Sequence, residues 1–367
     1  MKTIVVHLSG EERSYEIVLA TGGRQRLGGH LAQVLPGRRL WLVSDTLVAR
    51  LYGQELVTRL QQQGFPANLL TVARGERSKS WPVAARLMQQ LLAQGADRGS
   101  ALIALGGGVV GDLAGFVAAL FMRGIPVVQV PTTLLAMVDA SIGGKTAINL
   151  PAGKNLVGAF HQPRLVLIDP EFLLTLPRRE RLNGLAEVVK TGFIRDVGLL
   201  ELLAGPAGRL LANRQLSDRD LLLEVIGRAA AMKAAVVSAD EREGDLRRLL
   251  NFGHTLGHAL EKVSHFRLKH GEAVAVGMAA ALDLSVDLTG LPADQAREGK
   301  ELLKSLGLPS QAPALPEDEV LQALLVDKKK QGRRLVFVLL RQLGEAVVYP
   351  EVPVEMVAAW LRQNSGR

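Results

Sequence analysis

The chain of 367 residues contains no cysteine. Disulfides, thiolate metal sites, iron–sulfur clusters and cysteine nucleophiles are therefore excluded, and any metal ion must be held by His, Asp or Glu. Aromatic residues are scarce at 4%, whereas 48% of the residues are hydrophobic and 22% are charged. This balance is typical of a globular protein with one or two packed cores, and it excludes disordered and collagen-like chains.

Long hydrophobic runs are also missing. No apolar stretch approaches the roughly 18 residues that a membrane span requires. The N-terminal segment MKTIVVHLSGEERS reaches charged residues too soon to form the apolar core of a signal peptide. We therefore expect a cytoplasmic protein with no membrane partner.

Basic residues outnumber acidic ones by 44 to 36, which gives a formal charge of +8 and an isoelectric point near 9.9. This excess is compatible with nucleic acid or with a small anionic substrate. The one dense basic run is Lys328-Lys329-Lys330 with Arg333 and Arg334, and no aromatic residues are interleaved in it to stack bases. We interpret this run as a solvated loop and expect no nucleic-acid partner.

The first half of the chain alternates short apolar runs with helical patterns. This order predicts an α/β nucleotide-binding domain whose largely parallel sheet is covered on both faces. The predicted strands are Thr3–Leu8, Tyr15–Leu19, Leu40–Ser44, Asn68–Val72, Ala101–Leu105, Pro126–Val130 and Leu165–Ile168. The predicted helices are Gln54–Gln63, Val83–Gln94 and Leu113–Met122.

From about Arg178 the composition changes to Leu, Ala, Glu and Arg, which predicts a mainly helical domain. Its predicted helices are Arg181–Ile194, Asp218–Val237, Thr255–Lys262, Ala273–Leu288 and Ala293–Leu306. The alternating runs Leu335–Leu340 and Ala346–Tyr349 predict a hairpin before a last helix at Pro353–Arg362. We therefore expect two domains, residues 1–178 and 179–367.

A glycine-rich turn follows the predicted strand Ala101–Leu105, in the sequence Gly106-Gly107-Gly108-Val109-Val110-Gly111-Asp112. Such a turn at a helix N-terminus presents backbone N–H groups and the positive end of the helix dipole to a pyrophosphate. The spacing of Gly106, Gly108 and Gly111 matches a dinucleotide fingerprint, but the acidic residue expected about 20 positions downstream is missing. A plain tight turn is the alternative.

Acidic and basic side chains also follow other predicted strands. Asp45 ends the strand Leu40–Ser44, and Glu76 and Lys79 come after Asn68–Val72. Ligands of open parallel sheets bind beyond the carboxyl ends of the strands, so these residues are candidates for holding ribose or adenine. A turn or cap role is an equally good interpretation of Asp45.

Glycines stand directly before lysines in Gly143-Gly144-Lys145-Thr146 and in Gly153-Lys154-Asn155. The longer spacing of a nucleotide-hydrolysing phosphate loop is absent. An ammonium group is nevertheless a compact charge, and glycine lets backbone N–H groups reach the same oxygens. These segments therefore favour a phosphate-bearing ligand.

The helical half concentrates the metal-competent residues Glu187, His254, His258 and His270. Histidines four positions apart share one helix face, so spacing by itself favours His254 with His258, although it does not decide which two histidines bind. Four of the seven histidines, these three and His265, fall within 17 positions. We therefore expect a metal site, with separate core or surface roles as the alternative.

Taken together, these residues resemble 3-dehydroquinate synthases of the sugar-phosphate cyclase group. The likeness rests on Gly75-Glu76, Gly106–Lys154, Glu187 with Lys190, Asn251–His258, His270-Gly271-Glu272 and Asp327–Lys330. It covers most of the chain, and several motifs together are far more specific than one. The resemblance implies NAD in the α/β domain, one divalent metal ion (zinc or cobalt) in the helical domain, an active site between the two, and a homodimer.

The resemblance also implies roles for individual residues. The implied metal ligands are Glu187, His254 and His270, which leaves His258 as a polar or proton-handling group. The implied NAD-binding residues are Asp45, Glu76, Lys79, Gly107, Gly108, Val109, Gly111, Asp112, Thr132 and Thr133, with Lys145 and Lys154. The implied substrate-binding or catalytic residues are Asp139, Lys145, Lys154, Asn155, Lys190, Lys233, Arg247, Asn251 and Arg123, the last reaching a neighbouring subunit's site. Thr46 and Leu47 depart from the polar amide that many members carry after the acid.

The implied reaction converts 3-deoxy-D-arabino-heptulosonate 7-phosphate, a small anionic sugar phosphate, into 3-dehydroquinate and inorganic phosphate. It belongs to the shikimate pathway of aromatic amino acid biosynthesis and comprises transient oxidation by NAD, phosphate elimination, re-reduction and intramolecular aldol closure. The alternatives are another sugar-phosphate cyclase and an NAD- and metal-dependent polyol dehydrogenase. A dehydrogenase needs no phosphate cradle. A cyclase is therefore favoured by Lys145, Lys154, Asn155 and Lys190. A non-catalytic nucleotide-binding module would leave the metal-competent residues unexplained.

Overall fold

The computed structural model describes residues 1–8, 13–212, 218–242, 244, 246–326 and 335–366. These residues form two compact units: unit 1 comprises Met1–Leu176 with Leu222–Glu241, and unit 2 comprises Pro177–Leu221 with Arg242–Arg367. The first boundary between the units, after Leu176, lies close to the predicted boundary between domains 1–178 and 179–367. Residues 222–241 nevertheless belong to unit 1. No helix in the described part of the chain is long and apolar enough to cross a membrane. The basic run at Lys328–Lys330, Arg333 and Arg334 lies outside the described residues.

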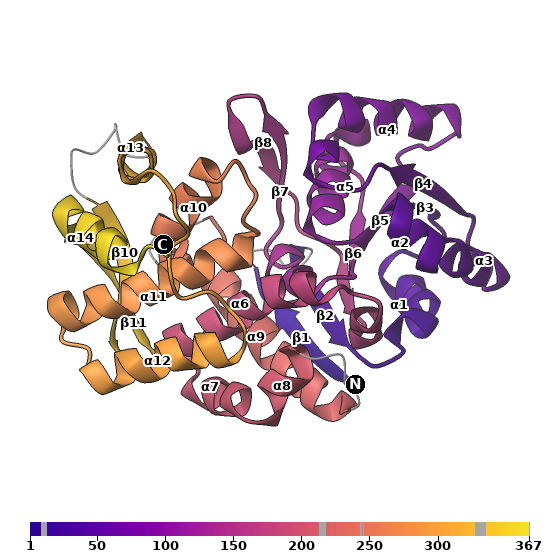
Figure 1. Cartoon of the computed structure of the whole chain (residues 1–367). Coiled ribbons are helices and arrows are strands. Elements are labelled where there is room, and N and C mark those ends of the chain that lie inside the picture. The colour runs from indigo at the N-terminus through magenta and orange to yellow at the C-terminus, as the bar shows by residue number, and fades with distance from the viewer. Residues whose placement is uncertain (9–12, 213–217, 243, 245, 327–334, 367) are drawn as a thin grey trace. The chain divides into compact units, whose positions relative to one another are not determined.

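Unit 1 is built on a seven-stranded sheet (Figure 1). In spatial order its strands are β1 (Lys2–Val6), β2 (Tyr15–Leu19), β9 (Leu165–Ile168), β6 (Val127–Pro131), β5 (Ser100–Gly106), β3 (Arg39–Asp45) and β4 (Ala67–Val72). Only β1 and β2 pair antiparallel; the other five pairings in this sheet are parallel. The predicted mostly parallel sheet is therefore confirmed.

The core of unit 1 lies around β5, whose seven residues are all buried. A strand at the centre of a parallel sheet is covered on both faces, which is why its sequence is a continuous apolar run rather than an alternation. The helices of unit 1 are α1 (Leu27–Val34), α2 (Thr46–Val48), α3 (Gln54–Gln62), α4 (Trp81–Ala93), α5 (Gly108–Leu120) and α9 (Arg219–Ala239). Helix α5 begins five residues before the predicted Leu113, so the glycine turn forms its first turn.

Helix α9 packs in unit 1, although the composition of its sequence predicts a place in the helical domain. The backbone N–H of His7 donates to Ser238 Oγ at 3.0 Å, and Gln162 Nε2 donates to Glu241 Oε1 at 3.1 Å. A Cβ atom added at Gly227 would lie 3.3 Å from Leu19 of β2. These contacts join residues more than 75 positions apart in the chain, so local composition does not reveal them.

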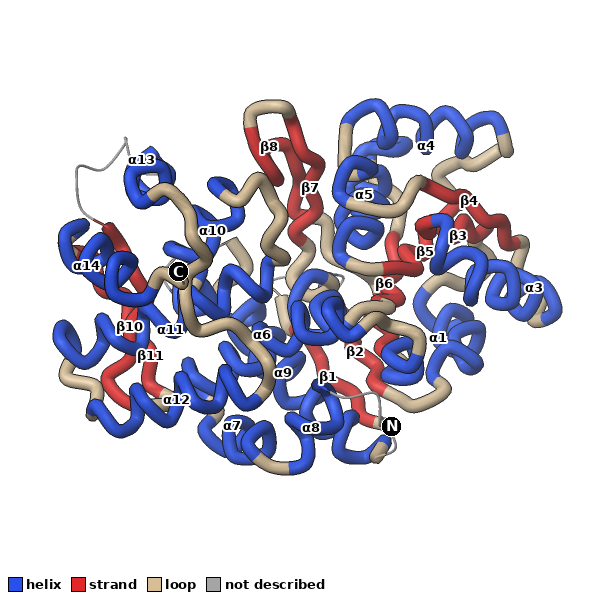
Figure 2. The backbone as a smooth tube through the Cα atoms, viewed as in Figure 1, coloured by secondary structure: helices blue, strands red, loops and turns tan. Residues whose placement is uncertain are grey.

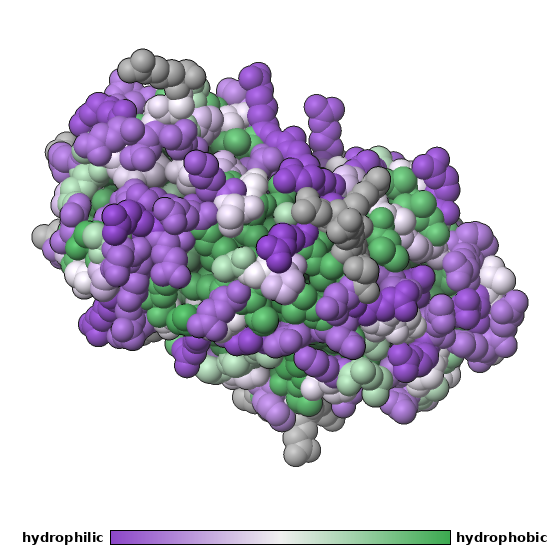
Figure 3. All heavy atoms as spheres, turned by 60° about the horizontal axis from the view of Figure 1, so that its bottom comes forward, coloured by the Kyte–Doolittle hydropathy of each residue, from purple (hydrophilic) through white to green (hydrophobic). Residues whose placement is uncertain are grey.

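A hairpin of β7 (Lys145–Leu150) and β8 (Gly153–Phe160) forms a separate antiparallel sheet in unit 1. It occupies the glycine- and lysine-rich segments, whose turn-forming residues hid the strand signal. Three large exposed apolar side chains, Leu150, Leu156 and Phe160, lie on this hairpin. Elsewhere in unit 1 such side chains are spread singly. Figure 3 shows one face of the molecule, on which both polar and apolar residues are exposed.

Unit 2 is mainly helical, with one antiparallel hairpin of β10 (Leu335–Gln342) and β11 (Glu345–Val352) (Figure 2). Its longer helices are α6 (Arg178–Arg195), α7 (Val197–Ala204), α8 (Pro206–Ala212), α10 (His254–Val263), α11 (His270–Thr289), α12 (Ala293–Ser305), α13 (Glu317–Val326) and α14 (Val354–Asn364), and a short helical turn, η8, spans Leu246–Asn251. The predicted helical domain and its hairpin are confirmed, and α7, α8 and α13 were not predicted.

Glycines let the central helices of unit 2 approach closely. A Cβ atom added at Gly271 of α11 would lie 2.2 Å from the backbone oxygen of Asn183 in α6. One added at Gly277 would lie 1.9 Å from the backbone oxygen of Gly253, which precedes α10. Real Cβ atoms do not make such contacts, so only glycine permits this packing at the two positions.

A buried carboxylate ties β9 to the segment after β2. Asp169 is 0% exposed and accepts hydrogen bonds from the backbone N–H groups of Gly22, Arg24 and Glu171 at 3.1–3.2 Å. The Arg24 guanidinium donates to the same carboxylate at 3.0 Å. Four donors therefore compensate for the burial of this charge.

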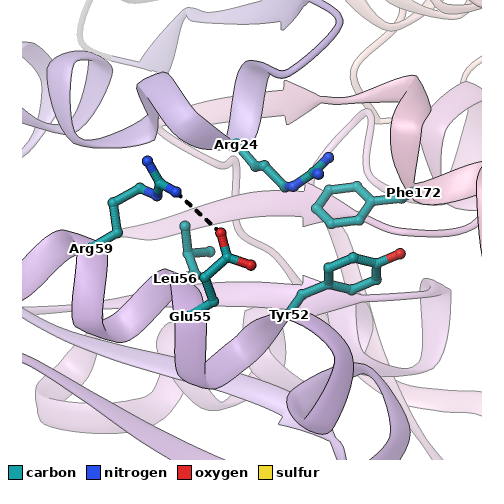
Figure 4. A pocket seen from close by; sticks show the side chains of 6 residues that line it. All are labelled: Arg24, Tyr52, Glu55, Leu56, Arg59 and Phe172. Carbon is teal, nitrogen blue, oxygen red and sulfur yellow. Dashed lines mark hydrogen bonds and ion pairs between the residues drawn. The ribbon is translucent and has the colours of Figure 1, made fainter.

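The Arg24 side chain is itself held by two aromatic rings, as Figure 4 shows. Its Cζ atom lies 5.7 Å from the ring centroid of Tyr52 and 5.5 Å from that of Phe172, within the range of cation–π attraction. Beside them, the exposed pair Arg59–Glu55 spans 3.1 Å on α3. The two ion pairs thus differ in burial within one small region.

We expect Asp169→Ala to lower the free energy of unfolding by about 3 kcal/mol, because it leaves three backbone donors without their acceptor and removes one of the two carboxylates, Asp169 and Glu171, that bind the Arg24 guanidinium. Glu55→Ala, which breaks the exposed pair with Arg59, should cost less than about 1 kcal/mol. Urea unfolding of both variants measures the difference. Equal losses would contradict this account of Asp169.

Candidate functional site

Three metal-competent side chains converge in unit 2. Glu187 lies in α6, and His254 and His270 are the first residues of α10 and α11. One donor atom from each lies within 4.8 Å of the other two. His270 Nε2 is 3.1 Å and His254 Nε2 is 3.6 Å from the same oxygen, Glu187 Oε1. The structure therefore brings together the three residues that the resemblance implies as ligands.

The pairing of His254 with His258 that helical spacing favours has a different geometry. The two rings lie edge to face with centroids 5.2 Å apart, and His270 is equally close to His254. Among the described residues, no metal-competent group contains both His254 and His258. His258 instead falls in a second group with Glu261 and His270. The partner that spacing could not supply comes from a neighbouring helix.

The site is buried and strongly charged. Glu187 is 2% exposed, and its Oε2 forms an ion pair with Lys190 one turn along α6. Burial would raise the pKa of Glu187, but Lys190, His254 and His270 together hold that pKa well below its usual range. Burial and the Lys190 charge lower the pKa of His254 well below its ordinary value. At neutral pH the site therefore offers a carboxylate and a neutral imidazole.

His270 behaves differently from His254. Burial opposes its charged form, but hydrogen bonds to Glu187 and Glu261 raise the pKa of His270 to about 10. A proton on this ring thus balances two carboxylates. Glu187 Oε2 is buried and faces the Lys190 ammonium. A carboxylate and two imidazoles around a position that attracts positive charge fit a divalent metal ion with an open coordination position.

The glycine turn lies where β5 ends and α5 begins. Gly107 precedes the first helical residue, Gly108, in an extended conformation. A Cβ atom added at Gly106 would lie 2.7 Å from Val110, and one at Gly111 would lie 2.9 Å from Gln129. Close packing therefore requires glycine at position 106 whatever the ligand, whereas the contact at Gly111 is with the end of the flexible Gln129 side chain. The N-terminus of this 13-residue helix still offers the N–H groups and dipole that attract a phosphate.

Lys79 contacts two other candidate residues of unit 1. Its side chain is almost fully buried, and Nζ contacts both Asp112 Oδ2 in α5 and Asn155 Oδ1 in the β7–β8 hairpin. Burial raises the pKa of Asp112, and the Lys79 ammonium acts in the opposite direction. Asn155 adopts a left-handed conformation with φ of 57°. The contact therefore holds a strained hairpin residue beside the start of α5.

Asn149 in β7 was missed by sequence reasoning. Its side-chain amide donates to Glu76 Oε1 at 2.7 Å, and its Oδ1 accepts from the Asn155 backbone at 3.0 Å. Its own backbone N–H donates to the Lys79 oxygen at 2.8 Å. An asparagine within a strand is the one local signal, because this residue type is depleted in strands. Asn149 thus links the hairpin to the loop after β4.

Two further candidates of unit 1 have local hydrogen-bond partners, and a third does not. Asp45 Oδ1 caps α2 by accepting from the backbones of Leu47 and Val48 at 2.9 and 3.1 Å, which is the cap role weighed for it. Thr133 Oγ1 accepts from the Ala136 backbone at 3.2 Å. Thr132 Oγ1 is buried without a hydrogen bond among the described residues.

Further candidates occupy scattered positions. Lys233 of α9 forms an ion pair with Asp139, which lies in a short helical turn, η6 (Ala136–Ala140). Arg123 is exposed with φ of 70°. Lys145 is also exposed, and Lys154 is half-buried.

Two neighbouring arginines of unit 2 differ in exposure. Arg247 is 3% exposed, whereas Arg248 is exposed. Both lie in η8, which also carries the exposed Asn251 and precedes α10. The buried guanidinium is thus that of Arg247, which the resemblance implies as a substrate-binding residue.

Comparison with protein families identifies both halves of the chain. The model of the 3-dehydroquinate synthase N-terminal region matches residues 69–183, and that of the C-terminal region matches residues 184–330. Proteins named 3-dehydroquinate synthase from Caulobacter vibrioides and Nostoc punctiforme are 46% and 43% identical to the chain. The matches cover 98% and 97% of this chain and 98% of each relative.

Solved structures of related enzymes share the fold. The 2-epi-5-epi-valiolone synthase of Streptomyces hygroscopicus, solved with NAD⁺ and Zn²⁺, is 32% identical with a TM-score of 0.87, over 97% of this chain and 98% of that one. A 2-deoxy-scyllo-inosose synthase complexed with carbaglucose-6-phosphate, NAD⁺ and Co²⁺ is 26% identical with a TM-score of 0.86, over 99% and 100%. The matches of the family models and of full-length relatives agree, and the chain belongs to the 3-dehydroquinate synthase family.

Proposed function

We propose that this chain converts 3-deoxy-D-arabino-heptulosonate 7-phosphate into 3-dehydroquinate and inorganic phosphate, as an NAD- and metal-dependent cyclase. Membership of the family supports the reaction. The observation that carries the proposal within this chain is the convergence of the Glu187, His254 and His270 donor atoms. The direct test supplies the heptulosonate phosphate and measures phosphate release, the carbocyclic product and free NADH. Product without accumulating NADH supports the proposal, whereas NADH release would indicate a dehydrogenase.

The cofactors follow from the fit of the two sites. Glu187, His254 and His270 would hold the metal ion, and the turn at Gly107–Asp112 with Glu76 and Lys79 would hold NAD. When bound, NAD accepts and returns a hydride, and a divalent metal ion lowers the pKa of a hydroxyl that coordinates it. The solved relatives that hold NAD⁺ with Zn²⁺ or Co²⁺ support this pair of cofactors.

The chain's own residues then bind and orient an anionic substrate. Lys145 and Lys154, on the β7–β8 hairpin, would hold phosphate oxygens, because ammonium groups beside glycines suit this ligand. Arg247 would grip the substrate carboxylate with two parallel hydrogen bonds. Lys190 keeps positive charge beside the Glu187 carboxylate, and the exposed His258 would move a proton at the edge of the site. Asp139, Asn155, Lys233 and Asn251 complete the proposed set.

The remaining expectations about assembly and location belong to this proposal. We infer a homodimer in which Arg123 of one copy reaches the other's site, and we infer a cytoplasmic location. The exposure and left-handed backbone of Arg123 support the first, because strained exposed residues are concentrated at functional sites. Light scattering of the purified protein, with complementation by mixing Arg123→Ala and His270→Ala chains, tests the shared site.

We expect Glu187→Gln, His254→Ala and His270→Ala each to lose bound metal and activity, because each removes one of three ligands. His258→Ala should retain metal and turn over more slowly. Elemental analysis of the dialysed variants, with activity measured in parallel, separates the two outcomes. Loss of metal from His258→Ala with retention by His270→Ala would instead establish the pair four residues apart.

We expect Gly107→Val to weaken NAD binding at least tenfold while metal content stays unchanged. A Cβ atom at this position would lie 3.0 Å from Thr133, and a branched side chain would crowd the helix N-terminus proposed to bind the pyrophosphate. Gly29→Val in α1 is the matched control, because no atom lies within 4 Å of a Cβ added there. Titration with NAD measures the affinity of both variants. Equal NAD affinities of Gly107→Val and Gly29→Val would contradict the role of the glycine turn.

We expect Arg247→Lys to lose at least tenfold in kcat/KM on the heptulosonate phosphate, because lysine cannot reproduce the bidentate grip on a carboxylate. Arg248→Lys, the exposed neighbour, should change kcat/KM less than twofold. Metal content and NAD affinity should stay normal in both variants. Unchanged kinetics for Arg247→Lys, or equally fast turnover of glucose 6-phosphate by the wild-type protein, would move the assignment to another sugar-phosphate cyclase.

A further inference from the structure

A second carboxylate lies behind the candidate metal ligand His270. Glu261 in the last turns of α10 is 7% exposed, and its Oε2 lies 3.2 Å from His270 Nδ1. On the other side of the ring, His270 Nε2 is 3.1 Å from Glu187 Oε1. The imidazole is therefore placed between two carboxylates, one on each nitrogen.

The helix geometry explains how Glu261 reaches this position. His254, His258 and Glu261 stand at positions i, i+4 and i+7 of α10, so all three lie on one face of the helix. Helix α11 begins at His270 beside this face, where Gly257 allows close contact because an added Cβ would lie 3.2 Å from the Ala273 backbone. One face of α10 thus supplies both a candidate ligand and the group behind a second ligand.

The two candidate histidine ligands have acceptors of different chemistry on their second nitrogen. His254 Nδ1 lies 3.1 Å from the backbone oxygen of Phe252, whereas His270 Nδ1 faces the Glu261 carboxylate. An acceptor at Nδ1 fixes the tautomer that leaves the Nε2 lone pair available to a metal ion. A carboxylate acceptor also makes the ligand more basic than a carbonyl does.

We propose that Glu261 is a positioning residue of the metal centre. It accepts the Nδ1–H hydrogen bond of His270, fixes the orientation of that ring, and holds Nε2 toward Glu187 and the metal ion. This proposal rests on the proposed function, because it requires that Glu187, His254 and His270 bind a metal ion.

A second metal ion is the competing use of the same atoms, since His258, Glu261 and His270 also lie within ligand range of one another. That arrangement would take Nδ1 of His270 as a ligand while Nε2 serves the first ion, and so would require an imidazolate bridge. His258 is exposed, whereas Glu261 is buried at hydrogen-bonding distance from Nδ1. The observations therefore favour a hydrogen bond behind one metal ion.

Two substitutions test the proposal through metal affinity rather than activity. Glu261→Ala removes the acceptor, and Glu261→Gln keeps a carbonyl acceptor without its charge. Competition with a chromophoric chelator should show Zn²⁺ bound about 100-fold more weakly by the alanine variant and about tenfold more weakly by the glutamine variant. Each should still bind one ion per chain, and kcat/KM of the zinc-saturated enzymes should fall less than the affinity does.

Asp283→Asn is the matched control. It removes one carboxylate from α11, where Asp283 binds Lys300 and the Trp360 indole, far along the helix from His270. Zn²⁺ affinity should be unchanged in this variant. The Nδ1–H signal of His270 in zinc-loaded, ¹⁵N-histidine-labelled protein provides a second readout, which the Glu261 variants should shift and Asp283→Asn should not. If the alanine variant does not fold, the glutamine variant and this signal still decide the question.

The outcomes separate the two proposals. Wild-type protein that binds no metal and forms no product would overturn the proposed function. Active wild-type protein with one ion, and equal affinity in the Glu261 variants, would overturn the positioning role alone. Two ions per wild-type chain, with one lost on Glu261→Gln, would replace the positioning role with a second metal site.

Discussion

The candidate metal centre depends on the close approach of three helix backbones in unit 2. Glu187 comes from α6, and each histidine begins its own helix, so the donor atoms meet only if α11 lies directly against α6 and α10. Gly271 and Gly277 permit that contact, because any side chain there would overlap backbone oxygens. The donor atoms can therefore lie within 4.8 Å of one another only because these glycines let the helices pack so closely.

Burial of the charged groups at this site costs free energy and shifts their pKa values. Placing the Glu187 carboxylate at 2% exposure would be unfavourable for an isolated charge, and Lys190 on the same helix offsets part of that penalty. The pKa of Glu187 falls well below its usual value while that of His270 rises to about 10, so each group is charged at neutral pH. A divalent ion held by Glu187, His254 and His270 in place of the His270 proton would set two positive charges, rather than one, beside the same carboxylates. The site is therefore preorganised for a cation rather than assembled by it.

Sequence reasoning succeeded where the signal is local and failed where it depends on packing. The fully buried strand β5 reads as an unbroken apolar run, and the helix after Gly107 follows from a glycine turn. Spacing within one helix favours His258 as the partner of His254, because periodicity carries no information about a neighbour from α11. The residue type made His270 a candidate, and only the family resemblance chose it over His258. The place of α9 in unit 1 and the role of Asn149 rest on contacts between distant segments, which no local pattern encodes.

Within each unit, lysines among the candidate residues contact carboxylates, as in Lys190–Glu187 of unit 2 and in Lys79–Asp112 and Lys233–Asp139 of unit 1. An anionic ligand that reaches such a lysine competes with a partner already in place, so it gains less free energy than it would from a lysine paired only with water. The protein gains a fixed position for the positive charge, because a paired ammonium is held at one point instead of sampling many rotamers. For a reaction that must oxidise, eliminate and close a ring on one bound molecule, fixed charges at defined positions matter more than maximal affinity, since tight uniform binding does not accelerate any of these steps.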